Sequence, residues 1–382
     1  MQPEDYPSYA FGTVRRTPGR FGYFAFHPTS CPREMSLAPE TVSALSAADR
    51  ALGRLAGAGR LLPNPHLLVQ PYLTREALAS SQIEGTQASL SDVLEQDASG
   101  TPSRDPDIQE VQNYVAAFEL GRRLLDELPL SLRLLRAMHE RLMAGVRGQD
   151  KHPGEFRSTQ NWVGAPGSTL EAARFVPPPV AAMQDALRDL ERYLNEPTTL
   201  PPLVVCAMAH YQFETIHPFL DGNGRLGRLL VTLFLIANGE LPEPLLYLSP
   251  YFERDRTAYY EHLQAVREHG RVQEWLVYFL NGVALQARDA VERVDRLVDL
   301  QTTYRQQLVD DRSQASAVVE LLFGNPFVTT RRVTDALSIT NAGANNLLRR
   351  LETLGILQQL SKRGQGGRLT WVASEIFTAI AD

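Results

Sequence analysis

The sequence predicts a mainly α-helical protein organised around one polar, glycine-rich corner. Apolar residues recur at helical spacing in two long stretches, residues 107–128 and 203–216. A further apolar run, residues 229–236, is typical of a buried helix, and the corner lies between it and the second stretch, at residues 217–228. Strand-like patterns are confined to short segments. We therefore expect helices to form the body and strands to contribute only small hairpins.

Composition places the chain among ordinary globular proteins. It has 382 residues, 43% hydrophobic and 21% charged, which is enough for two or three domains. The net charge of −6 argues against nucleic-acid binding over the whole surface. The two cysteines, Cys31 and Cys206, form neither a disulfide framework nor a zinc spacing, as expected in a reducing cytoplasm. Neither a signal peptide nor a membrane-spanning run is predicted.

Residues 1–65 are predicted to form an N-terminal arm and helices. The first 36 residues are rich in proline, glycine and aromatic residues, and residues 21–26 are expected to form a short strand or an extended arm. An alanine-rich helical pattern follows from about residue 38, and Pro63 ends it. This region suggests no function.

Residues 66–100 contain a second informative stretch. Ser80 and Glu84 are four residues apart and therefore lie on one face of a helix. Gly85 stands where a C-capping residue ends the helix. On spacing alone, Glu84 fits either a solvated helix face or a contact with another part of the chain.

Residues 101–300 are predicted to form the helical core. Its helices cover residues 107–128, 130–143 and 273–300, and Tyr259 begins another that runs to about residue 269. His139 lies on one of these helices, and we interpret it as a core or capping residue. Two short apolar segments around a Gly/Pro/Ser turn, within residues 153–179, predict a β-hairpin.

The corner at residues 217–228 combines groups that suit phosphate chemistry. Gly222 and Gly224 permit a tight turn that points several N–H groups into one concavity, where the next helix begins. Arg225 and Arg228 are three residues apart and present two guanidinium groups on one face. Asp221 can hold Mg²⁺ against phosphates, and His217 is expected to titrate near neutral pH as a general base. Together they predict an anion cradle with a metal ligand and a base.

Two other interpretations of this corner were weighed. Gly222, Gly224 and Gly227 also match the dinucleotide fingerprint G-x-G-x-x-G, which requires a preceding strand inside a βαβ unit. Here the preceding segment has helical period. A solvated polar turn is the other alternative, and two arginines beside two glycines and an aspartate argue against it.

The stretch His217-Pro-Phe-Leu-Asp-Gly-Asn-Gly-Arg-Leu-Gly-Arg228 resembles the Fic family pattern His-Pro-Phe-x-Asp-Gly-Asn-Gly-Arg-x-x-Arg at every fixed position. The resemblance covers roughly residues 66–285. It implies a helical enzyme that moves AMP from ATP onto a protein hydroxyl, with His217 catalytic and Mg²⁺ on Asp221. In that interpretation a hairpin flap pairs with the target and brings Val163 and Gly164 near the nucleotide, and Tyr259 lies against adenine. The remaining ATP-binding residues are Asp221, Gly222, Asn223, Gly224, Arg225, Leu226, Gly227 and Arg228.

The stretch Ser80-x-x-x-Glu84-Gly85 resembles the Fic inhibitory motif [Ser/Thr]-x-x-x-Glu-[Gly/Asn]. The resemblance implies that Glu84 reaches Arg228 and occupies the place of the ATP γ-phosphate. A bidentate carboxylate–guanidinium pair would compete with that phosphate for the same group.

Residues 301–382 differ in pattern from the core. Three helices, at 315–323, 330–337 and 342–354, precede two strand-like runs at 356–360 and 368–372, an order that resembles a winged helix-turn-helix. Residues 329–370 hold seven basic and two acidic residues in an otherwise acidic chain. This asymmetry permits DNA binding through residues 315–372, although protein docking or dimer contact is favoured.

The predicted function is protein adenylyl transfer to a Ser, Thr or Tyr hydroxyl, held back by Glu84. ATP and a target protein are the expected partners, and self-modification and a homo-oligomer remain open. Two alternatives stay beside it: a Fic enzyme that uses another donor such as UTP or removes AMP, and a DNA-binding regulator whose helical body senses a nucleotide.

Overall fold

The computed structural model describes residues 3–19, 22–61, 65–164, 167–360 and 369–381. Within them the chain is mainly helical, as predicted, and the strands are short. A single-turn helix, Pro3–Asp5, precedes the others. The helices are α1 Pro39–Leu61, α2 Pro65–Ile83, α3 Leu90–Ser99, α4 Pro106–Leu124, α5 Leu132–Leu142, α6 Val180–Asn195, α7 Pro202–Ile216, α8 Asn223–Ala237, α9 Ser249–Arg254, α10 Arg256–His269, α11 Val272–Gln307, α12 Ala315–Gly324, α13 Thr330–Leu337, α14 Asn341–Thr353 and α15 Ser374–Ala381. The strands are β1 Gly12–Arg16, β2 Phe24–Pro28, β3 Phe327–Thr329, β4 Gln358–Gln359 and β5 Thr370–Val372.

Helices α7 and α8 form the centre of the body. Every residue of α7 from Leu203 to Ile216 is buried, and most of α8 is buried too. A helix that is apolar all round must be surrounded by others. The neighbours are α2, α4, α5, α6 and α11, so the loop between α7 and α8 is held on several sides.

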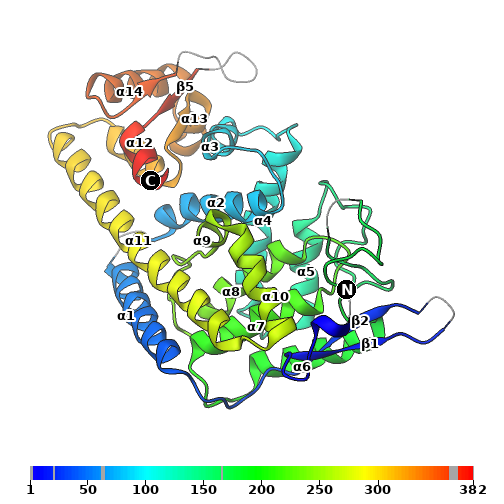
Figure 1. Ribbon diagram of the computed structural model, residues 1–382. Coiled ribbons are helices and arrows are strands. Elements are labelled where there is room, and N and C mark those ends of the chain that lie inside the picture. Colours follow the sequence, from blue (N-terminus) through cyan, green and yellow to red (C-terminus); the bar gives the residue numbers. More distant parts are fainter. Residues whose placement is uncertain (1–2, 20–21, 62–64, 165–166, 361–368, 382) are drawn as a thin grey trace.

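Helix α11 connects the body to the C-terminal part of the chain (Figure 1). Its first half buries Trp275, Leu276 and Phe279 in the body, and α1 packs along it. The boundary predicted at residue 300 falls inside this continuous helix. The hydrophobic core accordingly continues from the body into the C-terminal part.

Helix α2, which precedes Glu84, is fixed to the body by a buried carboxylate. Glu76 accepts hydrogen bonds from the Tyr114 hydroxyl at 2.9 Å and from the Ser249 amide at 3.0 Å and hydroxyl at 2.5 Å. These donors lie on α4 and at the start of α9. The helix ends at Ile83, and Gly85 follows with φ of 105°, a conformation that favours glycine. The predicted helix end at Gly85 is confirmed.

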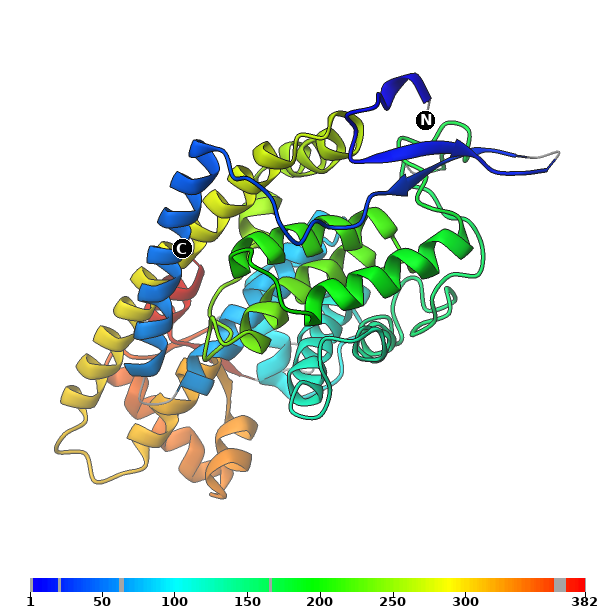
Figure 2. The same ribbon diagram turned by 90° about the horizontal axis from the view of Figure 1, so that it is seen from below.

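The N-terminal segment forms a hairpin that extends along one edge of the body (Figure 2). Strand β2 pairs antiparallel with β1. Of the two structures expected near residues 21–26, a short strand or an extended arm, the structure has the strand, at residues 24–28. The Phe26 amide donates to the Val176 carbonyl at 2.9 Å. The hairpin therefore lies against the segment predicted as the flap.

The predicted flap hairpin is reduced to one antiparallel bridge. Val163 and Phe175 exchange both backbone hydrogen bonds, at 2.8 and 3.1 Å. The described residues on either side form no further ladder. Three consecutive prolines, Pro177–Pro179, follow the second arm and cannot donate to a sheet. The predicted turn includes residues 165–166, which lie outside the described residues.

The C-terminal part contains the predicted elements of a winged helix-turn-helix in the predicted order. Strands β3, β5 and β4 form an antiparallel sheet in that spatial order beside α12, α13 and α14. Strand β3 and helix α15 were not predicted. The loop at residues 361–368, with Lys362, Arg363 and Arg368, lies outside the described residues.

This C-terminal part packs on the region that follows Glu84. The Asn325 amide donates to the Leu94 carbonyl at 2.9 Å, and the Thr329 hydroxyl donates to the Ala98 carbonyl at 3.1 Å. Phe327 and Val372 pack against Leu94 and Ala98 of α3. Helix α12 also contacts α2. The body and the C-terminal part therefore share an interface at α2 and α3.

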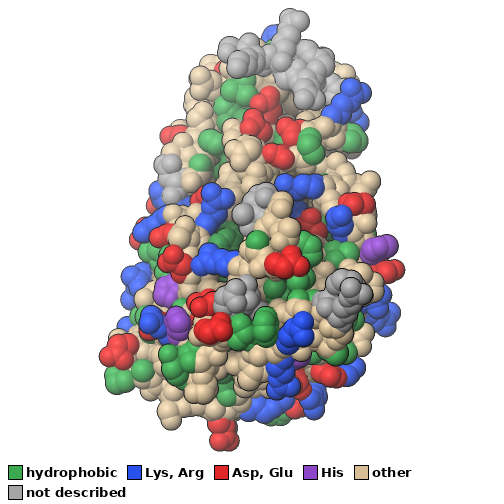
Figure 3. Space-filling model, turned by 45° about the vertical axis from the view of Figure 1, so that its right-hand side comes forward, with side chains coloured by type: hydrophobic (Ala, Val, Ile, Leu, Met, Phe, Trp, Pro, Cys, Tyr) green, Lys and Arg blue, Asp and Glu red, His purple; other side chains and the backbone are tan. Residues whose placement is uncertain are grey.

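Three of the four described basic residues predicted for a DNA-binding face have acidic neighbours. Arg331 pairs with Asp335 at 3.4 Å, and Arg350 pairs with Asp311. Arg332 lies near Asp97, although burial lowers the pKa of this arginine. Basic and acidic side chains are interspersed on the face drawn in Figure 3.

Within the described residues, no helix is both long and apolar enough to cross a membrane.

We expect Glu76→Ala to lower the free energy of unfolding by about 3 kcal/mol, because it leaves three buried donors without their acceptor. Urea denaturation at pH 7 measures the change. Glu292→Ala, at an exposed site on α11, is the matched control and should stay within about 0.5 kcal/mol of the unchanged protein. Equal stability of both variants would contradict the assigned role of Glu76.

Candidate active site

A cavity of about 640 Å³ opens at the corner between α7 and α8. Its walls come from the end of α2, the flap, the corner itself and α10. The lining residues are Glu84, Trp162, Val163, Gly164, Arg174, Phe175, Glu214, His217, Gly224, Arg228, Tyr260, Leu263, Gln264 and Arg267. Among the predicted site residues, the cavity therefore brings together Glu84, Val163, Gly164, His217, Gly224 and Arg228.

The loop that carries His217 is held by side chains that bind its backbone. His217 ends α7 in the left-handed region, with φ of 50°. Its carbonyl accepts from Arg157 Nε at 3.0 Å and from Asn161 Nδ2 at 3.2 Å. Asn223 binds Phe219 through both atoms of its amide, at 2.8 and 2.9 Å. The amide side chain of Asn223 is thus committed to shaping the loop.

Helix α8 begins at this loop and directs its N-terminus toward the cavity wall at Gly224. Gly222 is the N-cap, with φ of 75°. The first N–H groups of a helix have no partner inside it, and they carry the positive end of the helix dipole. The turn therefore has the helix N-terminus on which the predicted anion cradle depends.

His217 is half-buried and its Nδ1 is fully enclosed, and this changes the predicted titration. Desolvation, together with the charges of Arg267 and Arg157, lowers the pKa of His217 to about 4. The prediction of titration near neutral pH is wrong for this state, because the sequence does not show how fully the ring is enclosed. At neutral pH the imidazole is uncharged and can accept a proton.

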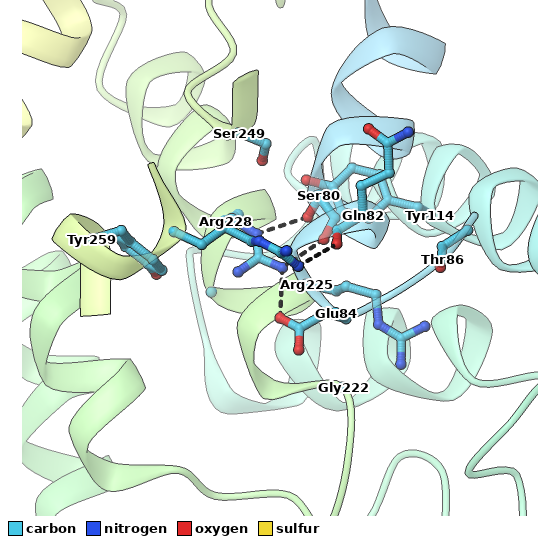
Figure 4. Close-up of polar contacts among 12 residues, drawn as sticks. Ser80, Gln82, Glu84, Thr86, Tyr114, Gly222, Arg225, Arg228, Ser249 and Tyr259 are labelled. Atoms are coloured by element: carbon cyan, nitrogen blue, oxygen red, sulfur yellow. Dashed lines mark hydrogen bonds and ion pairs between the residues drawn. The ribbon is translucent and has the colours of Figure 1, made fainter. Parts of the chain in front are cut away.

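Glu84 and Arg228 form the predicted contact (Figure 4). Arg228 Nη2 lies 2.8 Å from Glu84 Oε1 and 2.8 Å from the Ser80 carbonyl, and Arg228 Nε donates to Ser80 Oγ at 2.8 Å. The guanidinium is 1% exposed, whereas the Glu84 side chain retains 31% of its surface. Ser80 and Glu84 thus both bind one guanidinium, and the contact of Glu84 with Arg228 is the one that the resemblance to the inhibitory motif implies.

The charges of this pair stabilise each other. Burial raises the pKa of Glu84, but the charge and hydrogen bond of Arg228 outweigh it, and the net pKa lies below the ordinary value. Burial lowers the pKa of Arg228, but the Glu84 charge and neighbouring groups raise it overall. Both groups are therefore charged at neutral pH.

Arg225 does not join Arg228 in the cavity. Its guanidinium is 1% exposed and lies 3.6 Å from Glu110 of α4 and 3.5 Å from Asp221. The prediction that both arginines present one phosphate-binding face is wrong in this structure. Their Cα atoms share a face, but the long side chain of Arg225 turns toward a carboxylate on another helix.

Asp221 retains one carboxylate oxygen for a ligand. Its Oδ1 accepts from the Gly222 amide at 2.6 Å and lies 3.5 Å from Arg225 Nη2, while Oδ2 binds none of the described residues. In the described part of the chain, no three His, Cys, Asp or Glu side chains gather into a metal site. Mg²⁺ commonly binds one or two carboxylates, with water and substrate phosphates as the remaining ligands. This donor set fits that mode of binding.

The structure places Tyr259 in the core. It is fully buried, and its hydroxyl lies 2.9 Å from His210 Nε2. Tyr260 lines the cavity instead. The prediction that Tyr259 lies against a nucleotide base is therefore wrong in this structure, and Tyr260 is the tyrosine that faces the cavity. Adjacent residues on a helix point about 100° apart, so one tyrosine faces the core and the other faces the cavity. The sequence pattern did not show which was which.

Leu226 and Gly227 serve packing in this structure. Leu226 is fully buried. A Cβ at Gly227 would stand 2.3 Å from Glu214 Oε1, so a larger residue there would require the Glu214 side chain to move. His139 is bound by the Gly154 amide and the Asp221 carbonyl, both at 2.9 Å, which confirms its interpretation as a core residue.

Sequence reasoning missed Glu214 and Arg267, which both line the cavity. Glu214 is 7% exposed and Arg267 is also 7% exposed. Burial raises the pKa of Glu214 to about 7, against the lowering effect of the Arg228 charge. One signal was available: Glu214 is the one carboxylate in α7, and it lies one turn before His217.

Comparison with known proteins identifies the family of this site. A family model described as the Fic/DOC family N-terminal region matches residues 42–123, and one described as the Fic/DOC family matches residues 129–235. The chain thus contains a Fic domain at residues 129–235. The matched ranges contain Glu84 and the whole stretch from His217 to Arg228.

Curated relatives carry the name "Protein adenylyltransferase Fic". The Drosophila erecta protein is 31% identical over 151 residues, which is 39% of this chain and 27% of the relative. The Drosophila willistoni protein is 27% identical over 209 residues, or 52% and 38%. The chain therefore spans about a quarter to two fifths of the length of these curated relatives.

Solved structures share the Fic fold. A Fic family protein from Desulfovibrio desulfuricans G20 superposes with a TM-score of 0.58 at 23% identity, covering 89% of this chain and 97% of that one. Fic-1 from C. elegans superposes with a TM-score of 0.52 at 23% identity, covering 66% and 73%. At this identity the likeness concerns the fold.

The raised pKa of Glu214 predicts a pH-dependent stability. An unfolded glutamate titrates near 4.5 and the folded one near 7, so the folded state binds more protons between these values and loses stability as pH rises through them. We expect Glu214→Gln to remove this loss. Between pH 4.5 and pH 8, the free energy of unfolding of the variant should therefore rise by about 3 kcal/mol relative to that of the unchanged protein. Urea denaturation of both proteins at several pH values measures it. A difference that stays constant with pH would contradict the assignment.

Proposed function

We propose that this protein transfers AMP from ATP to a hydroxyl side chain of a protein, and that Glu84 restrains the reaction. The observation that carries the proposal is one cavity that joins an uncharged histidine, a helix N-terminus and a buried arginine paired with a glutamate. The names of the Drosophila relatives support adenylyl transfer.

Phosphates suit the polar end of the cavity. The N-terminus of α8 offers N–H groups at Gly224, and Arg228 offers a guanidinium in the same wall. In this proposal Asp221 would hold Mg²⁺, which supplies charge neutralisation on the phosphate oxygens. Arg225, 3.5 Å from Asp221, orients that carboxylate.

His217 provides the base. The target hydroxyl gives its proton to the imidazole as its oxygen attacks the α-phosphorus of ATP. A P–O bond to the target forms, the bond from the α-phosphorus to the bridging oxygen breaks, and pyrophosphate leaves. The low pKa of His217 keeps the ring ready to accept this proton across the neutral range.

The flap is suited to present the target. Its two arms meet in a single bridge at Val163 and Phe175, and the neighbouring Trp162 side chain is 41% exposed. An extended peptide can add to such a backbone edge by strand pairing. The hydroxyl would then enter the cavity beside His217.

Glu84 restrains the reaction by occupying Arg228. An incoming γ-phosphate needs the guanidinium that Glu84 and Ser80 now hold. ATP can bind in a productive position only when the carboxylate leaves.

Replacing Glu84 should activate the protein. We expect Glu84→Gly to raise the transfer of label from α-labelled ATP to lysate proteins, because it frees the Arg228 guanidinium. His217→Ala in the same background should lower the rate by about 10²- to 10⁴-fold. His269→Ala, on the exposed end of α10, is the matched control and should leave the label unchanged. The readout is a denaturing gel.

Two outcomes of this experiment would contradict the proposal. Equal labelling by the unchanged protein and by Glu84→Gly would contradict the inhibitory role of Glu84. If no protein is labelled with ATP but proteins are labelled with α-labelled UTP, the donor is UTP and the proposal of AMP transfer is contradicted.

Asp221 should set the magnesium requirement. We expect Asp221→Asn in the Glu84→Gly background to raise the Mg²⁺ concentration for half-maximal labelling by about tenfold or more, because an amide oxygen is a weaker ligand than a carboxylate. A Mg²⁺ titration of the labelling rate measures this. An unchanged half-maximal concentration would show that Asp221 does not hold the ion.

A further inference from the structure

The cavity extends well beyond the phosphate end. Gly224, Arg228 and Glu84 lie at one wall, and the flap and α10 contribute a second, largely apolar wall. That second wall contains Val163, Phe175, Tyr260 and Leu263. Aromatic and aliphatic surfaces of this kind suit the flat face of a nucleobase and its sugar.

One carboxylate in this cavity has no role in the proposed chemistry. Glu214 is 7% exposed, and its Oε1 is buried without a hydrogen-bond partner among the described residues. The glycine at position 227 makes room for this oxygen, since a Cβ there would stand 2.3 Å from it. A buried acceptor without a donor is costly, and natural structures rarely keep one without a reason.

A phosphate does not suit Glu214 in its ionised form. Phosphate oxygens are acceptors and carry negative charge, as that carboxylate does. A group that binds the ionised Glu214 must therefore donate a hydrogen bond. In a nucleotide, the groups that donate are the hydroxyls of the ribose and the exocyclic amine of the base.

Arg267 provides a complementary donor on the same cavity. Its Nε donates to Thr215 Oγ1 at 3.0 Å and its Nη1 donates to Gln264 Oε1 at 3.2 Å, while the guanidinium lies 4.1 Å from the centre of the Phe175 ring. Nη2 has no acceptor in the described part of the chain. Glu214 and Arg267 form no ion pair with each other there, so each keeps capacity for a ligand.

We propose that Glu214 determines specificity for the donor nucleotide by accepting a hydrogen bond from its nucleoside part. The donor is a ribose hydroxyl or the amino group of adenine, and Arg267 binds an acceptor on the same nucleoside. This inference rests on the proposed function, because it takes the ligand of the cavity to be ATP.

Calorimetric titration without turnover tests the inference. The protein is the full chain with Glu84→Gly and His217→Ala, which opens Arg228 and prevents transfer. The probes are ATP, 2′-deoxy-ATP, 3′-deoxy-ATP and purine riboside triphosphate, which lacks the 6-amino group. We expect one of the three analogues to bind about ten- to a hundredfold more weakly than ATP, and its identity shows which group Glu214 binds.

Variants then assign the loss to Glu214. Glu214→Leu should weaken the binding of ATP by the same factor. It should leave the binding of the weakly bound analogue unchanged, so that removing the ligand group and removing Glu214 do not have additive effects on affinity. Glu214→Gln keeps an acceptor oxygen and should retain most of the discrimination. The analogue series on the protein with Glu214 intact remains decisive even if the leucine variant fails to fold.

The outcomes separate this inference from the proposed function. Equal binding of ATP and all three analogues, or unchanged ATP binding by Glu214→Leu, overturns the inference alone. Selective binding by this protein, with no label on any gel, overturns adenylyl transfer but supports the role of Glu214. No binding of ATP overturns both.

Discussion

The contact between Arg228 and Glu84 determines the state of the whole site. One guanidinium, 1% exposed, binds a carboxylate, a hydroxyl and a carbonyl that all come from the end of α2. A buried guanidinium needs such partners, because an unpaired charge in the interior is costly. The side chains that fix α2 to the body, above all Glu76, therefore also fix the occupant of the phosphate end of the cavity.

A second constraint is the charge balance around His217. Burial is the main reason that the pKa of His217 falls, and the charges of Arg267, which lines the same cavity, and of Arg157, which binds the His217 carbonyl, lower it as well. The charge of Glu84 acts in the opposite direction. The two arginines thus help to keep the imidazole uncharged at neutral pH.

The sequence predicted the helical fold and the pairing of Glu84 with Arg228, 144 residues apart, because both rest on short motifs with fixed spacing. The predictions were wrong or incomplete where the contacts of a residue depend on distant parts of the chain. Arg225 turns to Glu110 on another helix, Tyr259 and Tyr260 compete for one wall, and β3 becomes a strand only by pairing with β5. Such contacts join distant parts of the chain, and local periodicity does not encode them.

Release of the contact between Glu84 and Arg228 requires little movement. Glu84 lies one residue beyond the end of α2, next to Gly85 with its positive φ, and its side chain keeps 31% of its surface exposed. Helix α2 itself is held by Glu76 and by α12 of the C-terminal part. Rotation of the Glu84 side chain is therefore far less costly than displacement of the helix. Once it turns away, Arg228 keeps only Ser80 as a partner, and a phosphate that restores the lost charge pair gains the full benefit of a buried, pre-oriented guanidinium.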